Sequence, residues 1–194
     1  MNHIVNLPVE SLTHVVNIED PRVLVPIKEL EEMFMKDSSK PITVKSMYST
    51  PDISEKIIKY NTDIATITNC TRKTIGKTHD VRYFKITVKF YPTEKEVELI
   101  LPSYSKLFSR TAKSYVPAEF IRKSDILTDY TGNIVQVLTN ELIEDYKPTE
   151  YYSLTLNTMN SKNPITFYLN GIFGNVCYND FNLEEDEDDT DNEE

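Results

Sequence analysis

The sequence predicts a mainly β protein with one short helix near its N-terminus, and three observations lead to this prediction. Residues 83–91 and 96–101 are rich in β-branched and aromatic side chains that alternate with polar ones, as strands do. Residues 26–36 instead carry apolar side chains at helical spacing. The chain has 194 residues, which suffices for one domain with a core, and it contains no apolar run long enough to cross a bilayer.

The first 25 residues are expected to form an extended arm. Their short apolar stretches are interrupted by Pro8 and Pro21, which prevent one long helix or a central strand. Apolar surface of this extent needs to be buried. Because the rest of the chain can close its own core, we expect the arm to lie on a neighbouring molecule. The candidate partner-binding residues are Val15, Val16, Val23 and Leu24.

The helix is expected at about 26–36. Pro26 suits the first turn of a helix, and Ile27, Leu30 and Phe34 recur on one face. A polar stretch that contains Pro41 follows it.

From Ile42 onward the pattern predicts strands. Residues 83–91 and 96–101 are expected to form a hairpin, because a polar turn containing a proline separates them. A strand is expected at 133–138, after the turn at Gly132. We expect a second hairpin from residues 151–156 and 165–169, and a short helical turn near 117–121.

The strand segments also suggest an internal repeat. Residues 83–88 match residues 151–156 in type at an offset of 68, and Tyr60, Ile64 and Ile67 match Tyr130, Ile134 and Val137 at an offset of 70. Two matches at nearly one offset suggest a pseudo-duplicated β-domain.

The acidic charge is concentrated at the C-terminus. The formal net charge is -10, and nine of the 31 acids lie in residues 184–194, which hold no base. Such a segment buries nothing and is expected to be disordered, either as a solvating terminus or as a tail that occupies a basic surface. We therefore divide the chain into an arm with a short helix (1–39), a β-domain (40–180) and an acidic disordered tail (181–194).

Two segments resemble a known family. An aromatic strand at 167–169 is followed by Asn170-Gly171-Ile172 and then by Asn175, a pattern that resembles the last motif of Hint domains, the self-splicing or self-cleaving domains of inteins and hedgehog proteins. Residues 115–127 resemble the central segment of that family, with Ser124 in place of its usual glycine. The resemblance covers about residues 40–176. It implies a Hint-like, pseudo-twofold β-horseshoe, which agrees with the repeat.

The residues that the family uses for catalysis do not match. The resemblance places the starting nucleophile near Ser38, Ser39 or Lys40, where no Cys occurs. Leu101-Pro102-Ser103-Tyr104 stands in place of a Thr-x-x-His sequence. Gly174 replaces the histidine before the last asparagine, and Val176 follows that asparagine in place of Cys, Ser or Thr. Because a nucleophile without an acid–base partner is weak, we expect no enzymatic activity and no catalytic residues.

Other reactive side chains form no clear site. Cys70 and Cys177 are expected to be structural thiols, and the three histidines lack metal-ligand spacing, so neither a metal nor a cofactor is expected. A basic loop that could touch single-stranded nucleic acid contains Arg72, Lys73, Lys77 and Arg82.

The sequence thus favours a structural or assembly protein whose partners are other protein chains. Abundant Asn, Ile, Lys, Tyr and Thr suggest AT-rich coding, and a phage virion component (tail, baseplate or head) is the specific expectation. The alternatives are a nucleic-acid-linked accessory protein with an acidic regulatory tail, and a self-processing domain. The N-terminus lacks the pattern of a secretory leader, so we expect the virion or the cytoplasm, with no membrane contact.

Overall fold

A computed structural model of the chain describes residues 2–8, 14–16, 24–52, 57–74, 81–129, 131–158, 166–169 and 172–175. Their side chains are described over residues 25–44, 64–74, 81–129 and 131–157. The predicted acidic tail (181–194) lies outside the described residues. Within the described part of the chain, no helix is long and apolar enough to cross a membrane.

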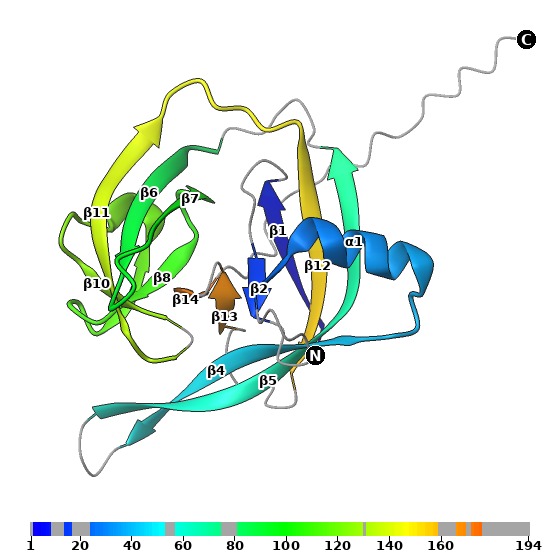
Figure 1. The fold of residues 1–194 in the computed structure, drawn as a ribbon, viewed down its shortest axis with the longest axis horizontal. Helices are drawn as coiled ribbons and strands as arrows, with labels where there is room; N and C mark the ends of the chain where they lie inside the picture. Colours follow the sequence, from blue (N-terminus) through cyan, green and yellow to red (C-terminus); the bar gives the residue numbers. More distant parts are fainter. Residues whose placement is uncertain are drawn as a thin grey trace, which may run out of the picture.

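The described strands form two sheets (Figure 1). The spatial order of the larger sheet is β1 (Asn2–Pro8), β12 (Glu150–Thr158), β5 (Ile57–Thr74), β4 (Ile42–Asp52), β13 (Thr166–Leu169), β14 (Ile172–Asn175), β8 (Lys106–Ser109) and β9 (Ser114–Pro117). Beside this path, β2 (His14–Val16) pairs with β13 and with β3 (Leu24–Pro26). The smaller sheet runs β10 (Ile126–Thr128), β11 (Ile134–Ile143), β6 (Tyr83–Phe90) and β7 (Glu96–Pro102). The predicted fold class, mainly β with a short N-terminal helix, is confirmed.

The first predicted hairpin is confirmed. Strands β6 and β7 pair antiparallel from Tyr83 opposite Pro102 to Lys89 opposite Glu96. The core face carries buried Ile86 and Val88, as period-2 alternation requires.

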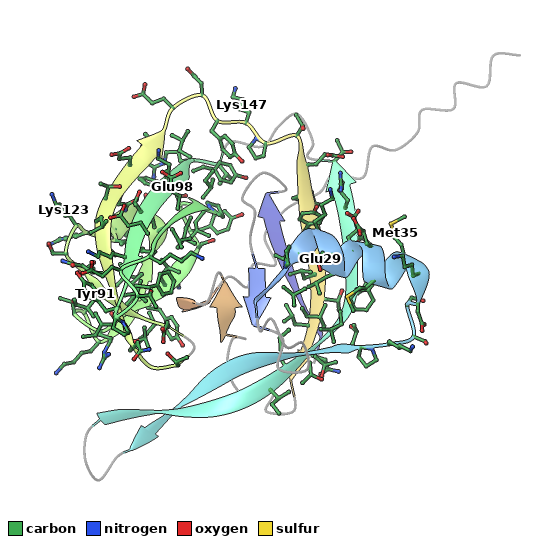
Figure 2. The ribbon with its side chains drawn as sticks, in the orientation of Figure 1. Glu29, Met35, Tyr91, Glu98, Lys123 and Lys147 are labelled. Carbon is green, nitrogen blue, oxygen red and sulfur yellow. The ribbon has the colours of Figure 1, made fainter. Side chains whose placement is uncertain are left out.

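The predicted helix is α1 (Ile27–Lys36), which begins one residue later than expected. Pro26 precedes the helix and has an extended backbone. Proline lacks a backbone N–H, and at this end of a helix the N–H groups have no carbonyl partner within the helix, so the helix loses no hydrogen bond. Ile27, Leu30 and Phe34 are buried, whereas Met35 is 81% exposed. The apolar face of α1 thus packs on the larger sheet, where it contacts β5 (Figures 1 and 2).

The N-terminal arm has hydrogen-bonding partners within its own chain. Strand β1 pairs with β12 along its whole length, from Asn2 opposite Asn157 to Pro8 opposite Tyr151. Strand β2 lies between β3 and β13, because Val15 is opposite both Val25 and Leu169. The larger sheet therefore supplies the partners that the sequence analysis assigned to a neighbouring molecule.

The second predicted hairpin is wrong, although both of its strands exist. Strand β12 pairs with β1 and β5, while β13 pairs with β14, β4 and β2. Local alternation predicts a strand but does not identify its partner. Here β5, which spans 18 residues, offers β12 a longer ladder than β13 with its four residues could.

The strand pairing has the symmetry that the repeat predicted. The repeat relates β5 to β11 and β6 to β12. In the structure, β5 pairs with β12 and β11 pairs with β6, so exchanging the two halves of the chain maps one pairing onto the other. Each ladder also contains one register shift, at Val137/Thr139 and at Thr155/Leu156. The pairing thus agrees with a pseudo-twofold arrangement of two similar halves.

The turn before β10 places Ser124 in the left-handed region, at φ 75°. The Ser124 N–H donates to the carbonyl of Val137 (2.9 Å), and the N–H of Arg122 donates to the Asp125 carboxylate (2.9 Å). These bonds hold the turn in a conformation that favours glycine. This is the position where the family resemblance has glycine.

We expect Ser124→Gly to stabilise the protein. A left-handed serine costs about 1–2 kcal/mol, and part of the gain is offset by the greater freedom of glycine in the unfolded chain. The free energy of unfolding should rise by about 0.5–1 kcal/mol in urea denaturation. The matched control is Ser114→Gly in strand β9, which should lower stability instead. A stability of Ser124→Gly equal to or below that of the parent would contradict this interpretation.

Candidate functional site

The segment that stands in place of the family's Thr-x-x-His sequence crosses from one sheet to the other. Leu101 and Pro102 end β7 in the smaller sheet, and Lys106 begins β8 in the larger one. The turn between them is fixed by backbone hydrogen bonds: the Ser103 N–H donates to the Arg82 carbonyl (2.8 Å), and the Ser105 N–H donates to the Pro102 carbonyl (2.9 Å). The backbone therefore sets the positions of Ser103, Tyr104 and Ser105.

The short 3-10 helix η2 (Ala118–Phe120) packs against this turn. The Ala118 N–H donates to the Ser105 carbonyl (2.7 Å), and the Glu119 N–H donates to the Ser103 carbonyl (3.3 Å). The Asn140 side-chain amide donates to the carbonyls of Ala118 (2.7 Å) and Ile121 (2.8 Å), which anchors η2 to β11. The predicted helical turn near 117–121 is thus confirmed, and it forms one wall of the site.

Strand β14 brings the last family motif to the same place. It pairs antiparallel with β8, with Gly174 opposite Leu107 and Asn175 opposite Lys106. Asn175 therefore lies one residue along the ladder from the turn at 103–105, although about 70 residues separate them in sequence. We call residues 101–106 together with β14 the composite site.

The described side chains at the composite site are buried or half-buried. Leu101, Pro102 and Ser105 are buried. The Ser105 Oγ has no hydrogen-bond partner among the described residues. Arg82 and Glu119 form an ion pair beside the turn (2.6 Å), with the arginine side chain largely exposed. This arrangement can hold two sheets together, and none of the described side chains accepts a hydrogen bond from the Ser105 hydroxyl.

The other predicted motif residues divide between described and undescribed parts of the chain. Ile172 and Asn175 lie in β14, whereas Asn170 and Gly171 lie outside the described residues. Among the candidate partner-binding residues, Val15 and Val16 lie in β2 and Leu24 lies in β3, and Val23 lies outside the described residues. Both edges of β2 are paired at Val15, so its backbone there is not open to an added strand.

The residues proposed to match the family's starting nucleophile do not reach the composite site. Ser38 and Ser39 form the turn after α1, and Figure 1 shows this turn well separated from β14 and β8. The Ser39 hydroxyl donates to the Asp37 carboxylate (2.6 Å), and this bond is the main reason why the pKa of Asp37 is lowered. Ser39 therefore caps a surface turn.

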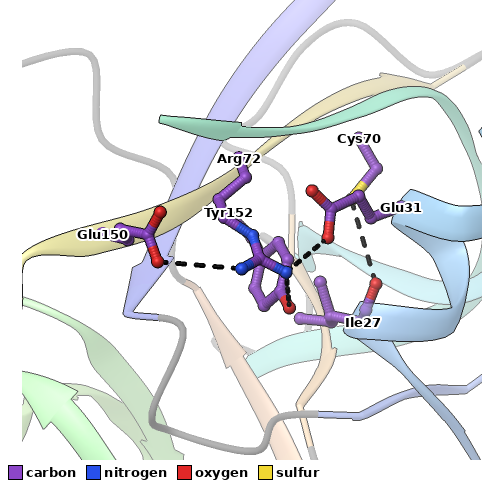
Figure 3. Close-up of polar contacts among 6 residues, drawn as sticks. All are labelled: Ile27, Glu31, Cys70, Arg72, Glu150 and Tyr152. Atoms are coloured by element: carbon purple, nitrogen blue, oxygen red, sulfur yellow. Dashed lines mark hydrogen bonds and ion pairs between the residues drawn. The ribbon is translucent and has the colours of Figure 1, made fainter. Parts of the chain in front are cut away.

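A cluster that sequence reasoning missed fastens α1 to the larger sheet (Figure 3). Arg72 on β5 pairs with Glu31 of α1 (2.9 Å) and with Glu150 of β12 (3.7 Å). Its guanidinium group lies 5.5 Å from the centre of the Tyr152 ring and also contacts the Tyr152 hydroxyl (3.5 Å). Glu31 raises the pKa of Arg72, through its hydrogen bond and its charge. The three partners of Arg72 lie 41 to 80 positions from it in sequence, and no local pattern connects them to it.

The same pairing bears on the predicted basic loop. Arg72 is balanced by Glu31 and Glu150, and Arg82 is balanced by Glu119. Lys73 is exposed, and Lys77 lies outside the described residues. Two of the four charges are thus shared with carboxylates, which weakens their attraction for a phosphate backbone.

Among the described residues, no group of three His, Cys, Asp or Glu side chains could hold a metal ion.

Cys70 is a buried thiol in the core beneath α1. Its Sγ lies 3.9 Å from the Ile27 carbonyl oxygen, and burial, helped by Glu31, raises its pKa from 9.0 to about 12. The reactive thiolate is therefore scarce at neutral pH.

We expect Cys70 to resist iodoacetamide at pH 8 in the folded protein and to react in urea. The Cys70 thiol ionises above pH 9 in the unfolded chain, whereas in the folded protein it stays protonated up to about pH 12. The free energy of unfolding should therefore fall between pH 9 and about 12. Peptide mapping by mass spectrometry measures the first effect. Cys70→Ala should abolish the part of the alkaline loss that the thiol causes, and rapid alkylation of folded Cys70 would contradict the assignment.

The comparisons with known proteins concern the fold alone. The sequence matches no protein-family model and no curated protein. Solved structures are nevertheless similar. The VidaL intein, in a selenomethionine variant, superposes with a TM-score of 0.51 at 14% identity over 90% of this chain and 98% of that one. An intein from a hyperthermophile gives a TM-score of 0.50 at 17% identity over 90% of this chain and 99% of that one.

These matches show that the chain has an intein-like fold, as the Hint resemblance predicted. They extend over more of the chain than residues 40–180, so they include residues outside the predicted β-domain.

Proposed function

We propose that this chain is a non-catalytic structural protein that uses an intein-like β-fold as a scaffold for assembly with other protein chains. The observation that carries the proposal is the composite site. Asn175 and the turn at 103–105 come together there, yet Tyr104 and Gly174 stand where the resemblance requires histidines. The buried Ser105 hydroxyl has no hydrogen-bond partner among the described residues, so none of these residues acts as a base toward it.

The setting we propose is a phage virion, where the chain would be a tail, baseplate or head component. Two features support this proposal. The residue usage of the chain is that of AT-rich coding, and the nine acids at 184–194 give a segment able to contact a basic surface on a partner.

Intact-mass spectrometry tests the absence of self-cleavage. We expect a single species of 22.5 kDa after prolonged incubation, with and without a thiol nucleophile. Ser39→Ala and Asn175→Ala should give the same single species. Fragments ending near residue 39 or residue 175 that disappear in these variants would refute the non-catalytic assignment.

Purification from the native source tests the assembly role. We expect the chain to remain attached to defined structural proteins at physiological salt, and mass spectrometry of the isolated particle identifies them. Recovery of the chain only as a free monomer would contradict the assembly role and leave the non-catalytic assignment standing.

A further inference from the structure

Two neighbouring turns carry a group of cations that have no acidic partner among the described residues. Arg110 and Lys113 lie in the turn between β8 and β9, and Arg122 and Lys123 lie in the turn before β10. All four side chains are exposed, and none of the four forms an ion pair within the described part of the chain. We call these four residues the cationic turns.

The two turns are joined by hydrogen bonds at one residue. The Arg110 N–H donates to the Ile126 carbonyl (2.7 Å), and the Ile126 N–H donates to the Thr111 hydroxyl (3.0 Å). The two turns are therefore adjacent, and Figure 2 shows Lys123 at the outer edge of the molecule. The acid nearest in sequence, Asp125, already accepts the backbone N–H of Arg122 through its carboxylate (2.9 Å).

Four other cations of the described residues pair with carboxylates. Lys85 pairs with Glu98, Lys89 pairs with Glu94, and Arg72 and Arg82 have the partners given above. The cationic turns thus concentrate positive charge in a protein whose net charge is -10.

The segment with the opposite charge follows a described residue that lies close to the cationic turns. The last described residue, Asn175, is paired with Lys106 at the start of β8, and Arg110 follows the end of that strand, about 13 Å further along. Residues 176–183 can extend over about 27 Å, so residues 184–194 can reach the cationic turns from the same molecule. A tethered segment acts at a high effective concentration, which favours this contact over a free anion.

We propose that the acidic tail, residues 184–194, docks on the cationic turns of its own chain. The contact is electrostatic and reversible, so it shields this surface until a competing polyanion or a more basic partner surface displaces the tail. This inference does not depend on the assembly role proposed above.

Paramagnetic relaxation in the full chain tests the docking. A spin label is attached to Asn192→Cys in a Cys177→Ser background, where Cys70 is only 2% exposed and remains unlabelled. At low salt, the amide signals of residues 110–113 and 122–124 should lose intensity. They should recover in about 1 M salt, where charges are screened beyond about 3 Å. Replacing Arg110, Lys113, Arg122 and Lys123 with glutamine should abolish the loss.

The matched control neutralises the exposed cations Lys28 and Lys36 on α1, which should leave the signal loss intact. Absence of signal loss at low salt, or a loss that the two sets of variants change equally, overturns the proposal. So does a loss that grows with protein concentration, which would place the tail on a second copy. A single-stranded oligonucleotide can also be titrated against the parent and against a variant whose tail acids are replaced by Asn and Gln. Equal affinity of the oligonucleotide for the cationic turns in both proteins would also overturn the proposal.

Discussion

Deleting residues 1–25 is expected to abolish cooperative folding. The deletion removes β1, which pairs with β12 over seven residues, and β2, which pairs with β3 and β13. It also removes Val25, which is fully buried in the core and whose burial contributes about 1.5–3 kcal/mol. A domain is stable by only about 5–15 kcal/mol, and the loss of β1 would turn β12 into an open edge.

Circular dichroism during heating and size-exclusion chromatography measure this effect. We expect the truncated chain to aggregate or to lose its cooperative transition. Deleting residues 184–194 is the matched control and should move the melting temperature little, because an acidic segment of this kind buries no apolar surface. A soluble truncated body with an unchanged transition would show that the arm is dispensable for folding and would restore its assignment to a neighbouring molecule.

Leu30→Ala is expected to lower the free energy of unfolding by about 2–5 kcal/mol. Leu30 is fully buried at the centre of the apolar face of α1, between Ile27 and Phe34, so its truncation leaves a cavity under the helix.

Urea denaturation of the variant measures this change against the parent. Met35→Ala on the same helix is the control and should cost less than about 0.5 kcal/mol, because Met35 is 81% exposed. Equal effects of the two substitutions would mean that α1 does not pack on β5 as described.

The elements that the sequence predicted correctly are those determined by neighbouring residues. The hairpin of β6 and β7 follows from alternation on both sides of a short polar turn, and α1 follows from Pro26 and three apolar residues at helical spacing. The offset of 68 to 70 residues predicted the symmetry of the pairing, because similar segments adopt similar roles in both halves.

The features that the sequence did not predict depend on contacts between distant segments. The placement of β1 beside β12, and the pairing of Arg72 with Glu31 and Glu150, join residues far apart in the chain. The apolar composition of residues 1–25 indicated that this segment must be buried against another surface, but it did not indicate whether that surface belongs to the same chain or to a neighbouring molecule. The composite site was predictable only in part: the motif at 170–175 was recognised, whereas its pairing with β8 emerged from the fold.

The pairing of β1 with β12 has a consequence for synthesis of the protein. Asn2 is opposite Asn157, so β1 must wait until about 155 further residues have been made before it can pair with β12. At about 5–20 residues per second, this wait is roughly 8–30 s, during which β1 lacks the strand β12 with which it pairs. Contacts between residues so distant also make folding slow once the chain is complete. Strand β1 is therefore open to a chaperone or another nascent partner during translation.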